Sequence, residues 1–390
     1  MVPTLHTTAL TSGVVATMLA LGSAAPAHGQ TGASREPVVA RQQVSAEGYT
    51  SARVCGECHR DIYDSWKGSL HAFSLTDPIF DTAFMQALRQ MGDGARRLCL
   101  RCHAPMTMFN GDHWLEQGVT REGVSCDFCH TVTGVHLDGR DQPYETAPGI
   151  VKRSTIEVSD SPAHQVAYSE LHATAEFCGG CHNFVSPGGA AVLTTYDEWR
   201  DGPYGAQGIP CQSCHMALSP GRVAEHPSSA GRQFNLHRLI RDTDQLRSAL
   251  AIEITQVTRS ADVVDVEVAL ENVGSGHMVP TGMPTREVVL TLSAESSRRS
   301  QTAERRYRKI IADSDGAVLE TDVDVLLRGA RILNDTRIAP GERRMERFRF
   351  RAFRDGPVTV RAVVSYKYAP AILDIRRMNI RLAGAERIIR

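Results

Sequence analysis

All ten cysteines of this 390-residue chain lie in five copies of one pattern, Cys-x-x-Cys-His. In c-type haem attachment, the two thiols of such a copy add to the vinyl groups at one porphyrin edge, and the adjacent histidine binds the iron. The sequence therefore predicts five covalently bound haem c groups. In chain order the copies are motif 1 (Cys55, Cys58, His59), motif 2 (Cys99, Cys102, His103), motif 3 (Cys126, Cys129, His130), motif 4 (Cys178, Cys181, His182) and motif 5 (Cys211, Cys214, His215).

Two other uses of paired cysteines fit the pattern less well. Four-cysteine zinc sites also contain Cys-x-x-Cys pairs, but zinc does not require a histidine directly after each pair. A disulfide framework would show varied spacings, because disulfides join whichever cysteines the fold brings together. Zinc remains the main alternative, and haem is favoured because every cysteine belongs to a complete motif.

The N-terminus resembles a cleavable export signal. Ala9 to Leu21 is an apolar stretch of the length expected of a signal core, and small residues such as Ala25 and Ala27 follow it. The stretch is shorter than the roughly 20 residues that a membrane-spanning helix needs. No Lys or Arg precedes Arg35, which departs from the usual signal pattern. We expect a periplasmic or extracellular protein, which agrees with covalent haem attachment.

The composition divides the chain into four segments: an export signal (1–29), a flexible linker (30–48), a pentahaem region of short helices and loops wrapped on a haem stack (49–243), and a β-sandwich (244–390). The last segment has no cysteine and contains alternating apolar and polar stretches separated by turn residues, which favours an immunoglobulin-like sandwich. The expected strands are Ala249–Val257, Val263–Leu270, Arg286–Leu292, Arg344–Arg351 and Val358–Tyr366.

One short stretch of sequence occurs twice. Tyr63-Asp-Ser-Trp66-Lys is echoed by Tyr196-Asp-Glu-Trp199-Arg, and the residue five positions beyond each tryptophan is His71 in the first copy and Tyr204 in the second. Either the two copies descend from one unit, with a ligand position changed to tyrosine, or they are unrelated amphipathic segments.

Second axial ligands must come from histidines outside the motifs. Ten of the fifteen histidines are outside, and two of these lie in the expected signal, which leaves eight candidates for five irons. Two histidines per iron are therefore available, whereas a methionine ligand would raise the reduction potential. The favoured candidates are His71, His164, His172, His237 and His277; His113, His136 and His226 are weaker.

At this point a family resemblance is visible. Trp66-Lys-Gly-Ser69-Leu-His71-Ala resembles the Trp-x-x-Ser-x-His-Ala signature of multihaem cytochromes related to hydroxylamine oxidoreductase and to the tetrahaem cytochrome of nitrifying bacteria. The turn Gly276-His277-Met-Val-Pro280-Thr281-Gly282 resembles one in the β-domain of some members, including members that polymerise into extracellular wires. The resemblance covers about residues 50–285, and it implies that His71, His172, His237 and His277 are distal ligands, with His164 a further one.

Two departures from related enzymes weaken a catalytic interpretation. Pentahaem nitrite reductases carry a Cys-x-x-Cys-Lys haem, whereas all five motifs here end in histidine. Hydroxylamine oxidoreductases have eight haems and a tyrosine crosslinked to one of them, and neither feature is visible. Whether the protein is an enzyme is left open, with an electron carrier favoured over a catalyst.

Three functional hypotheses follow. The favoured one is an electron carrier between redox partner proteins, namely a quinol-side donor or a terminal reductase. The alternative is an oxidoreductase that acts on nitrite, hydroxylamine or a related oxyanion at one open haem. The third is a subunit of a homo-oligomer or filament. Association with a membrane would occur through the partners, and a net charge of −1 gives no basis for nucleic-acid binding.

Overall fold

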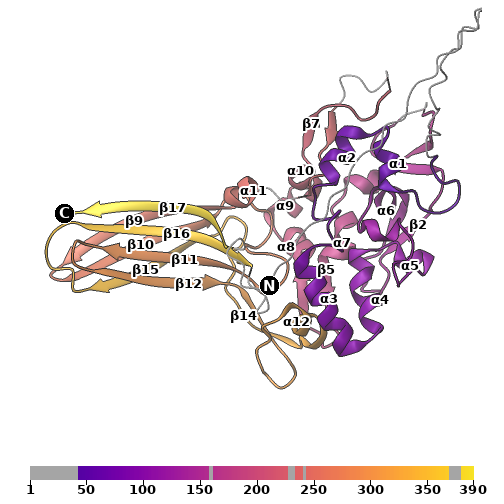
Figure 1. Ribbon diagram of the computed structural model, residues 1–390. Coiled ribbons are helices and arrows are strands. Elements are labelled where there is room, and N and C mark those ends of the chain that lie inside the picture. The colour runs from indigo at the N-terminus through magenta and orange to yellow at the C-terminus, as the bar shows by residue number, and fades with distance from the viewer. Residues whose placement is uncertain (1–42, 158–160, 227–232, 240–242, 369–378) are drawn as a thin grey trace, which may run out of the picture. The chain divides into compact units, whose positions relative to one another are not determined.

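The computed structural model describes residues 43–157, 161–226, 233–239, 243–368 and 379–390, and residues 42–390 form one compact unit (Figure 1). The expected export signal and most of the expected linker lie outside the described residues. Among the described residues, no helix has both the length and the apolar character needed to cross a bilayer. The expected division at residue 243 stays a prediction.

Short helices carry the five motifs and the segments between them. The longest, α3, begins after Asp77, whose carboxylate accepts hydrogen bonds from the Ile79 and Phe80 amides, and it ends at Gly92, which has a positive φ. The helices of this region are α1 (Ala52–Gly56), α2 (Arg60–Trp66), α3 (Pro78–Met91), α4 (Gly94–His103), α5 (Thr107–Asn110), α6 (Cys126–Thr131), α7 (Glu176–His182), α8 (Thr195–Arg200), α9 (Pro203–Ala206), α10 (Cys211–His215) and α11 (Thr243–Ser248), with 3₁₀ turns η1 (Thr120–Glu122) and η2 (Glu170–Ala173).

Small two-stranded sheets join these helices. β1 (Val132–Val135) pairs with β2 (Tyr144–Thr146), β3 (Val151–Ser154) with β4 (Gln165–Tyr168), β5 (Asn183–Val185) with β6 (Ala191–Thr194), and β7 (Leu218–Pro220) with β8 (Gln233–Asn235). The apolar clusters here are small; one contains Met106, Phe128, Val132 and Tyr144.

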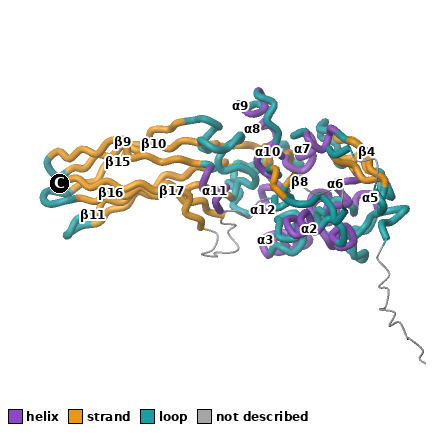
Figure 2. The backbone as a smooth tube through the Cα atoms, turned by 90° about the horizontal axis from the view of Figure 1, so that it is seen from above, coloured by secondary structure: helices purple, strands orange, loops and turns teal. Residues whose placement is uncertain are grey.

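Residues 250–389 form mainly antiparallel strands. One sheet has the order β15-β10-β9 and the other β12-β11-β16-β17, and Figure 2 shows them as two layers. The strands are β9 (Leu250–Ser260), β10 (Val263–Asn272), β11 (Arg286–Glu295), β12 (Ser300–Tyr307), β15 (Arg343–Arg351), β16 (Val358–Tyr368) and β17 (Asn379–Ile389); β13 (Lys309–Ala312) pairs separately with β14 (Arg331–Asp335), and α12 (Asp322–Arg328) lies between these two in the chain.

The two sheets share one apolar core. Alternate residues of β10, including Val264 and Val266, are buried, and so are Leu290 and Leu292 of β11. A strand that places every second side chain against a facing sheet produces this period of two. The alternation recognised in the sequence therefore marks the buried faces of these strands.

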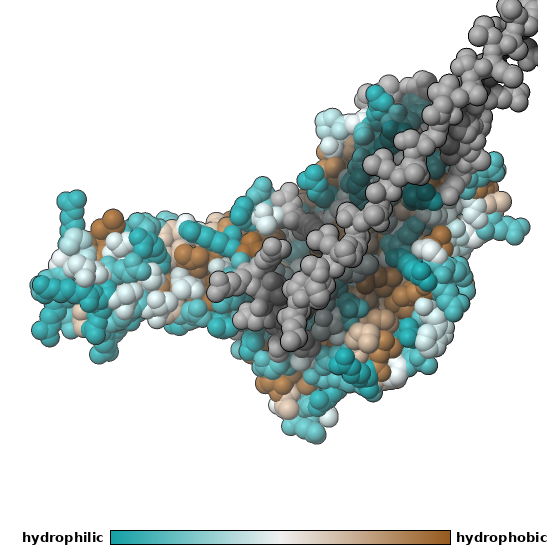
Figure 3. Space-filling model, in the orientation of Figure 1, coloured by the Kyte–Doolittle hydropathy of each residue, from teal (hydrophilic) through white to brown (hydrophobic). Residues whose placement is uncertain are grey.

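The outer surface of the strands is charged. Arg343 of β15 bonds Glu271 on the adjacent β10 and Glu253 on β9 beyond it, and Arg347 and Arg349 pair with acidic residues of β10. In the space-filling view the strand region is mostly hydrophilic (Figure 3). Such exposed pairs contribute about 0–1 kcal/mol each, so the core rather than the surface stabilises the sheets.

The strand region and the motif region are packed together through β13 and α12. Ile311 of β13 and Val325 of α12 share a buried cluster with Ala190 and Val192 around β6. Val323 of α12 packs into a second cluster with residues of α3 and α4. Apolar contacts therefore join parts of the chain that are more than a hundred residues apart in sequence.

The strands predicted from sequence are present, with small shifts at their ends. The prediction missed β12 and β17, which are the two edge strands of the four-stranded sheet, and it also missed the β13–β14 pair and the four two-stranded sheets of the motif region. β12 alternates half-buried residues with charged ones such as Glu304 and Arg306, so its apolar pattern is weak. The immunoglobulin-like classification of this region stays a prediction.

Replacing Leu290 by alanine should destabilise the protein by about 2–5 kcal/mol, because its fully buried side chain would leave a cavity between the sheets. Chemical denaturation of the haem-loaded protein measures this. The matched control is Leu333→Ala on β14, whose exposed side chain should change stability by less than about 0.5 kcal/mol. Equal losses from both substitutions would contradict the assignment of the core.

Candidate functional site

The motifs lie on or next to short helices, and this arrangement places their reactive side chains together. In α4, α6, α7 and α10 the two cysteines stand three residues apart and the histidine follows at the next position. Residues three and four apart lie on one face of a helix. Both thiols and the imidazole of a motif can therefore reach one flat group, as haem attachment requires.

Motif 4 fits this geometry because its two middle residues are glycines. An ideal Cβ on Gly180 would lie 2.7 Å from the Tyr144 ring, and one on Gly179 would lie 3.0 Å from the Tyr196 ring. The Tyr144 hydroxyl donates to the Phe177 carbonyl oxygen. Two tyrosine rings thus pack directly against the backbone of the motif.

Thiols from different motifs meet in pairs. Side-chain hydrogen bonds join Cys55 to Cys126, Cys102 to Cys181, and Cys178 to Cys211. No two of the ten cysteines are joined by a disulfide bond. A four-cysteine zinc site needs four thiolates around one point, whereas these contacts join two thiols at a time. The pairs link motif 1 with motif 3, motif 2 with motif 4, and motif 4 with motif 5.

Four motif histidines each face a histidine from elsewhere in the chain. An imidazole nitrogen binds a metal at about 2 Å, so two imidazoles on opposite sides of one iron have ring centroids roughly 6 Å apart. The observed centroid distances are 6.0 Å for His59–His164, 6.4 Å for His182–His71, 6.3 Å for His130–His237 and 6.3 Å for His215–His277. These spacings fit an iron between each pair.

Hydrogen bonds orient most of these rings. The Nδ1 atoms of His59, His103 and His130 bond the carbonyl oxygens of Val223, Ser74 and Arg153 at 2.5, 2.9 and 2.6 Å. The Nδ1 atoms of His164, His237 and His277 likewise bond the carbonyl oxygens of Gln165, Asn235 and Met278 at 3.0, 2.7 and 3.0 Å. A carbonyl that accepts from Nδ1–H fixes the neutral tautomer and leaves Nε2 available to a metal.

Burial keeps the imidazoles neutral, which is the form that binds metals. Desolvation, together with the smaller effect of neighbouring histidines, lowers the pKa of His71 to about 3. Desolvation also lowers the pKa of His215 and of His237 to about 4. At neutral pH these side chains therefore carry no proton that a metal would have to displace.

His172 differs from the other predicted distal ligands. Its ring centroid is 5.9 Å from that of His130, but its Nε2 lies 2.9 Å from the Cys129 carbonyl oxygen and its Nδ1 2.9 Å from the Ser169 hydroxyl. Both ring nitrogens are thus occupied, whereas His237 faces the same motif histidine with Nε2 available. The role of His172 as a ligand stays a prediction.

The motif 2 histidine is the other exception. Within the described part of the chain, no second histidine ring is paired with His103 near 6 Å. Its ring instead stacks on Phe80 at 3.9 Å. The weaker candidate His136 bonds Glu145 at the surface.

Two buried arginine atoms fit the carboxylates of a haem. Arg153 Nη1 and Arg286 Nε are buried without a hydrogen-bond partner. Arg286 is close enough to His182 to lower its pKa, after the larger effect of burial. The propionates of a haem would satisfy such guanidinium atoms. The sequence contains many arginines, and no local signal distinguished these two.

The repeated stretch of sequence has the same geometry in both copies. The Tyr63 and Trp66 rings in α2 are 5.8 Å apart with an interplanar angle of 38°, and the Tyr196 and Trp199 rings in α8 are 5.6 Å apart, also at 38°. Each tyrosine ring covers the glycine after the first cysteine of a motif, namely Gly56 of motif 1 or Gly179 of motif 4.

The tryptophans make equivalent hydrogen bonds. Trp66 Nε1 donates to the Val124 carbonyl oxygen, two residues before motif 3, and Trp199 Nε1 donates to the Ile209 carbonyl oxygen, two residues before motif 5. Since the first cysteines of motifs 1 and 3 are paired, as are those of motifs 4 and 5, the two copies form equivalent two-motif units. This favours descent from one unit over two unrelated segments.

Comparisons with known proteins agree with this site. Residues 54–131 match the family model described as "Cytochrome c554 and c-prime". The fold is similar to that of a pentahaem cytochrome c552 from Thermochromatium tepidum, with a TM-score of 0.70 and 21% identity over 87% of this chain and 99% of that chain. A β-glucosidase from Kluyveromyces marxianus overlaps with 36% of this chain and 14% of its own, at 12% identity and a TM-score of only 0.17. No curated protein matches the chain.

The cofactor follows from these findings together. The motifs supply the thiols and the first imidazoles, the family match covers three of the motifs, and the fold is that of a pentahaem cytochrome. The chain is a multihaem c-type cytochrome with covalently bound haem c.

Adding a methyl group at Gly180 should impair haem attachment at motif 4, because an alanine Cβ there would displace the Tyr144 ring. Mass spectrometry of Gly180→Ala, produced in a host that matures c-type cytochromes, should show a fraction with one haem fewer. Gly118→Ala is the control, since an added Cβ there meets no atom within 4 Å. A full haem complement in Gly180→Ala would contradict this account.

Proposed function

We propose that this cytochrome is an exported electron carrier in which four of five haem irons are each closed by two histidines. The observation that carries the proposal is the set of four histidine pairs at 6.0–6.4 Å, each joining a motif to a distant segment. An iron with both axial positions filled by protein has no site for a substrate, so it is suited to electron transfer.

The arrangement of the thiols supports transfer through the chain. Bound haem c supplies iron that alternates between ferric and ferrous states. The pairs Cys55–Cys126 and Cys178–Cys211 bring the attachment points of two motifs into contact within each repeated unit. The Cys102–Cys181 pair connects motif 2 to the second unit, and motif 4 participates in two of the three contacts.

Several narrower proposals accompany this one. The apolar stretch from Ala9 to Leu21 supports export to the periplasm or beyond, and redox proteins such as a quinol-side donor or a terminal reductase would be the partners.

The two sheets with a shared core support an immunoglobulin-like sandwich, since β9, β10 and β15 oppose β11, β12, β16 and β17. The quoted motifs support a relation to hydroxylamine oxidoreductases.

Electron paramagnetic resonance of the oxidised protein tests the ligand set. We expect mainly low-spin ferric signals, and His237→Ala should convert one low-spin haem to high-spin, because among the described residues it removes the facing imidazole whose Nε2 is available to the iron held by His130. His172→Ala should leave the low-spin signals unchanged, since both of its ring nitrogens bond protein atoms. The reverse result would assign His172 as the ligand.

One observation favours a second function. His103 of motif 2 has no opposing histidine among the described residues, which would leave one axial position of that iron open. The protein would then also be an oxidoreductase that binds nitrite, hydroxylamine or a related small molecule there. Motif 2 contacts motif 4 through the Cys102–Cys181 pair, so this position lies next to the rest of the motif network.

Titration with nitrite and with hydroxylamine tests this second function. The oxidised protein should show one high-spin haem whose signal shifts when either compound is added, while the low-spin signals stay constant. Substrate-dependent turnover with an artificial electron donor or acceptor would then establish an enzyme. If all five haems are low-spin and do not respond, the protein is an electron carrier alone.

A further inference from the structure

The turn that carries His277 is held from outside the strand region. His277 lies after β10, and its ring faces His215 of motif 5. Within its own region, the Asn272 side chain donates to the His277 carbonyl oxygen at 3.0 Å. Two hydrogen bonds from the turn to the motif region end on one side chain, Glu198 of α8, and a third joins the Thr281 and Thr195 hydroxyls at 2.8 Å.

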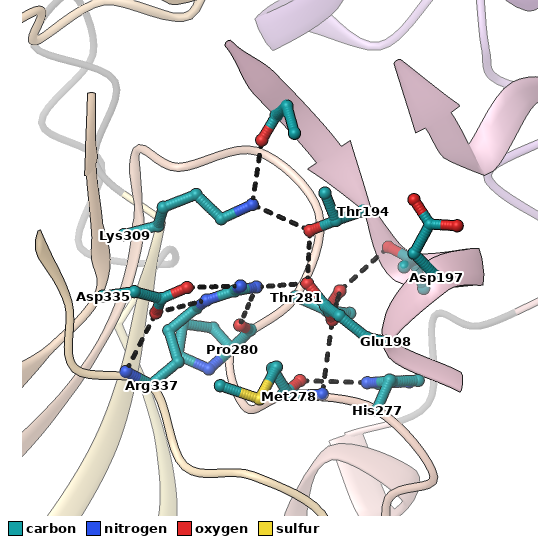
Figure 4. Close-up of polar contacts among 12 residues, drawn as sticks. Thr194, Asp197, Glu198, His277, Met278, Pro280, Thr281, Lys309, Asp335 and Arg337 are labelled. Carbon is teal, nitrogen blue, oxygen red and sulfur yellow. Dashed lines mark hydrogen bonds and ion pairs between the residues drawn. The ribbon is translucent and has the colours of Figure 1, made fainter. Parts of the chain in front are cut away.

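The Glu198 carboxylate accepts hydrogen bonds from two residues of the turn, Met278 and Thr281 (Figure 4). Its Oε2 accepts from the Met278 amide at 3.3 Å and from the Thr281 hydroxyl at 2.7 Å. Met278 is the residue after His277, and its carbonyl oxygen bonds His277 Nδ1. The carboxylate therefore binds the peptide unit adjacent to the imidazole, and any displacement of it would move the ring.

Other buried charges hold Glu198 in place. Its Oε1 accepts from Arg337 Nη1 at 2.5 Å and from the Thr194 hydroxyl at 2.6 Å. Only 6% of the Arg337 side chain and 8% of the Glu198 side chain are exposed. Arg337 also binds Asp335 through two hydrogen bonds of 2.8 and 2.7 Å. Lys309 donates to Thr194 at 2.7 Å, which completes the network in Figure 4.

The stability of the protein does not by itself explain such a pair. Removing two charges from water costs about as much as their attraction returns, so a buried ion pair is weak evidence for stability. What it does supply is a fixed geometry, because a guanidinium and a carboxylate joined by several hydrogen bonds have little freedom to move. The ligand-bearing turn is the element whose position this geometry determines.

The first repeated unit contains an independent parallel. The residue before the repeated tryptophan is Ser65 in α2 and Glu198 in α8. The Ser65 hydroxyl accepts a hydrogen bond from the His237 amide at 3.0 Å, and His237 faces motif 3. In both units, then, this position bonds the backbone that carries the histidine opposite the second motif of the unit.

We propose that Glu198, fixed by Arg337, is a positioning residue that holds His277 on the iron of motif 5, and that Ser65 does the same for His237 on the iron of motif 3. This inference rests on the bis-histidine ligation proposed above. Under this proposal the strand region contributes directly to a haem site, because it supplies one axial ligand, His277, and Glu198 determines where that ligand lies.

Displacement of the ligand by cyanide tests the proposal. Glu198→Gln keeps the size of the side chain but removes its charge. Because hydrogen bonds to a carboxylate are stronger than those to a neutral amide, we expect cyanide to displace one histidine about tenfold faster or more than in the unaltered protein. A rise in the reduction potential of one haem should accompany this. Glu253→Gln is the control, because Glu253 pairs with Arg343 on the exposed surface of the sheet. Faster displacement in this control as well would contradict the proposal.

Combined variants identify which haem responds. In a His277→Ala background, Glu198→Gln should have no further effect on cyanide binding. In a His237→Ala background, Glu198→Gln should still speed the displacement of a histidine by cyanide at a second haem. Ser65→Ala should show the opposite dependence. Unchanged displacement in Glu198→Gln, or equal effects in both backgrounds, would overturn the proposal.

Two further measurements separate the possible causes of failure. If His277→Ala creates no high-spin haem, the ligand assignment is wrong and the positioning proposal falls with it. If His277→Ala does create one while Glu198→Gln binds cyanide normally, only the positioning proposal is wrong. Should Glu198→Gln lose haem, Arg337→Lys, which preserves the charge but not the paired hydrogen bonds to Asp335, provides the test under the same criteria.

Discussion

The structure depends on four facing imidazole pairs, each of which joins a motif to a distant segment of the chain. One imidazole follows a pair of cysteines on a short helix, so its place is determined within five residues of chain. The opposing imidazole comes from a distant segment, as His277 does for His215. These pairs join segments whose own apolar clusters are small, such as the one that contains Met106, Phe128, Val132 and Tyr144.

Equivalent contacts show how five motifs are organised. α2 and α8 each place a tyrosine over a glycine of one motif and a tryptophan against the backbone before another. These contacts set the first cysteines of two motifs side by side. Motif 2 lies outside this repetition, and its histidine is also the one without an opposing imidazole among the described residues. The motif without an opposing imidazole among the described residues is thus the motif that the repetition does not include.

The strand region contributes a residue to the site, His277, in addition to packing against it. Its two sheets form an ordinary apolar core, which needs no cofactor to explain it. The turn after β10 nevertheless presents His277 to motif 5, while Glu198 and Arg337 join that turn to α8 across a buried ion pair. The residue equivalent to Glu198, Ser65, bonds the backbone of His237. One position in each repeat therefore connects α2 or α8 to the backbone at or next to an imidazole that faces a motif histidine.

The sequence alone determined the cofactor and its attachment residues, because the Cys-x-x-Cys-His spacing is a local covalent requirement. It also determined the main strands, since alternation reports burial on one face, but it missed edge strands such as β12, whose inward residues are mostly only half buried. His71, His164, His237 and His277 could be selected as candidates, yet their partners could not be assigned. Only the tertiary structure decided these pairs, the crowded surroundings of His172 and the Glu198–Arg337 contact. Each of them joins residues far apart in the chain, and no local pattern encodes that distance.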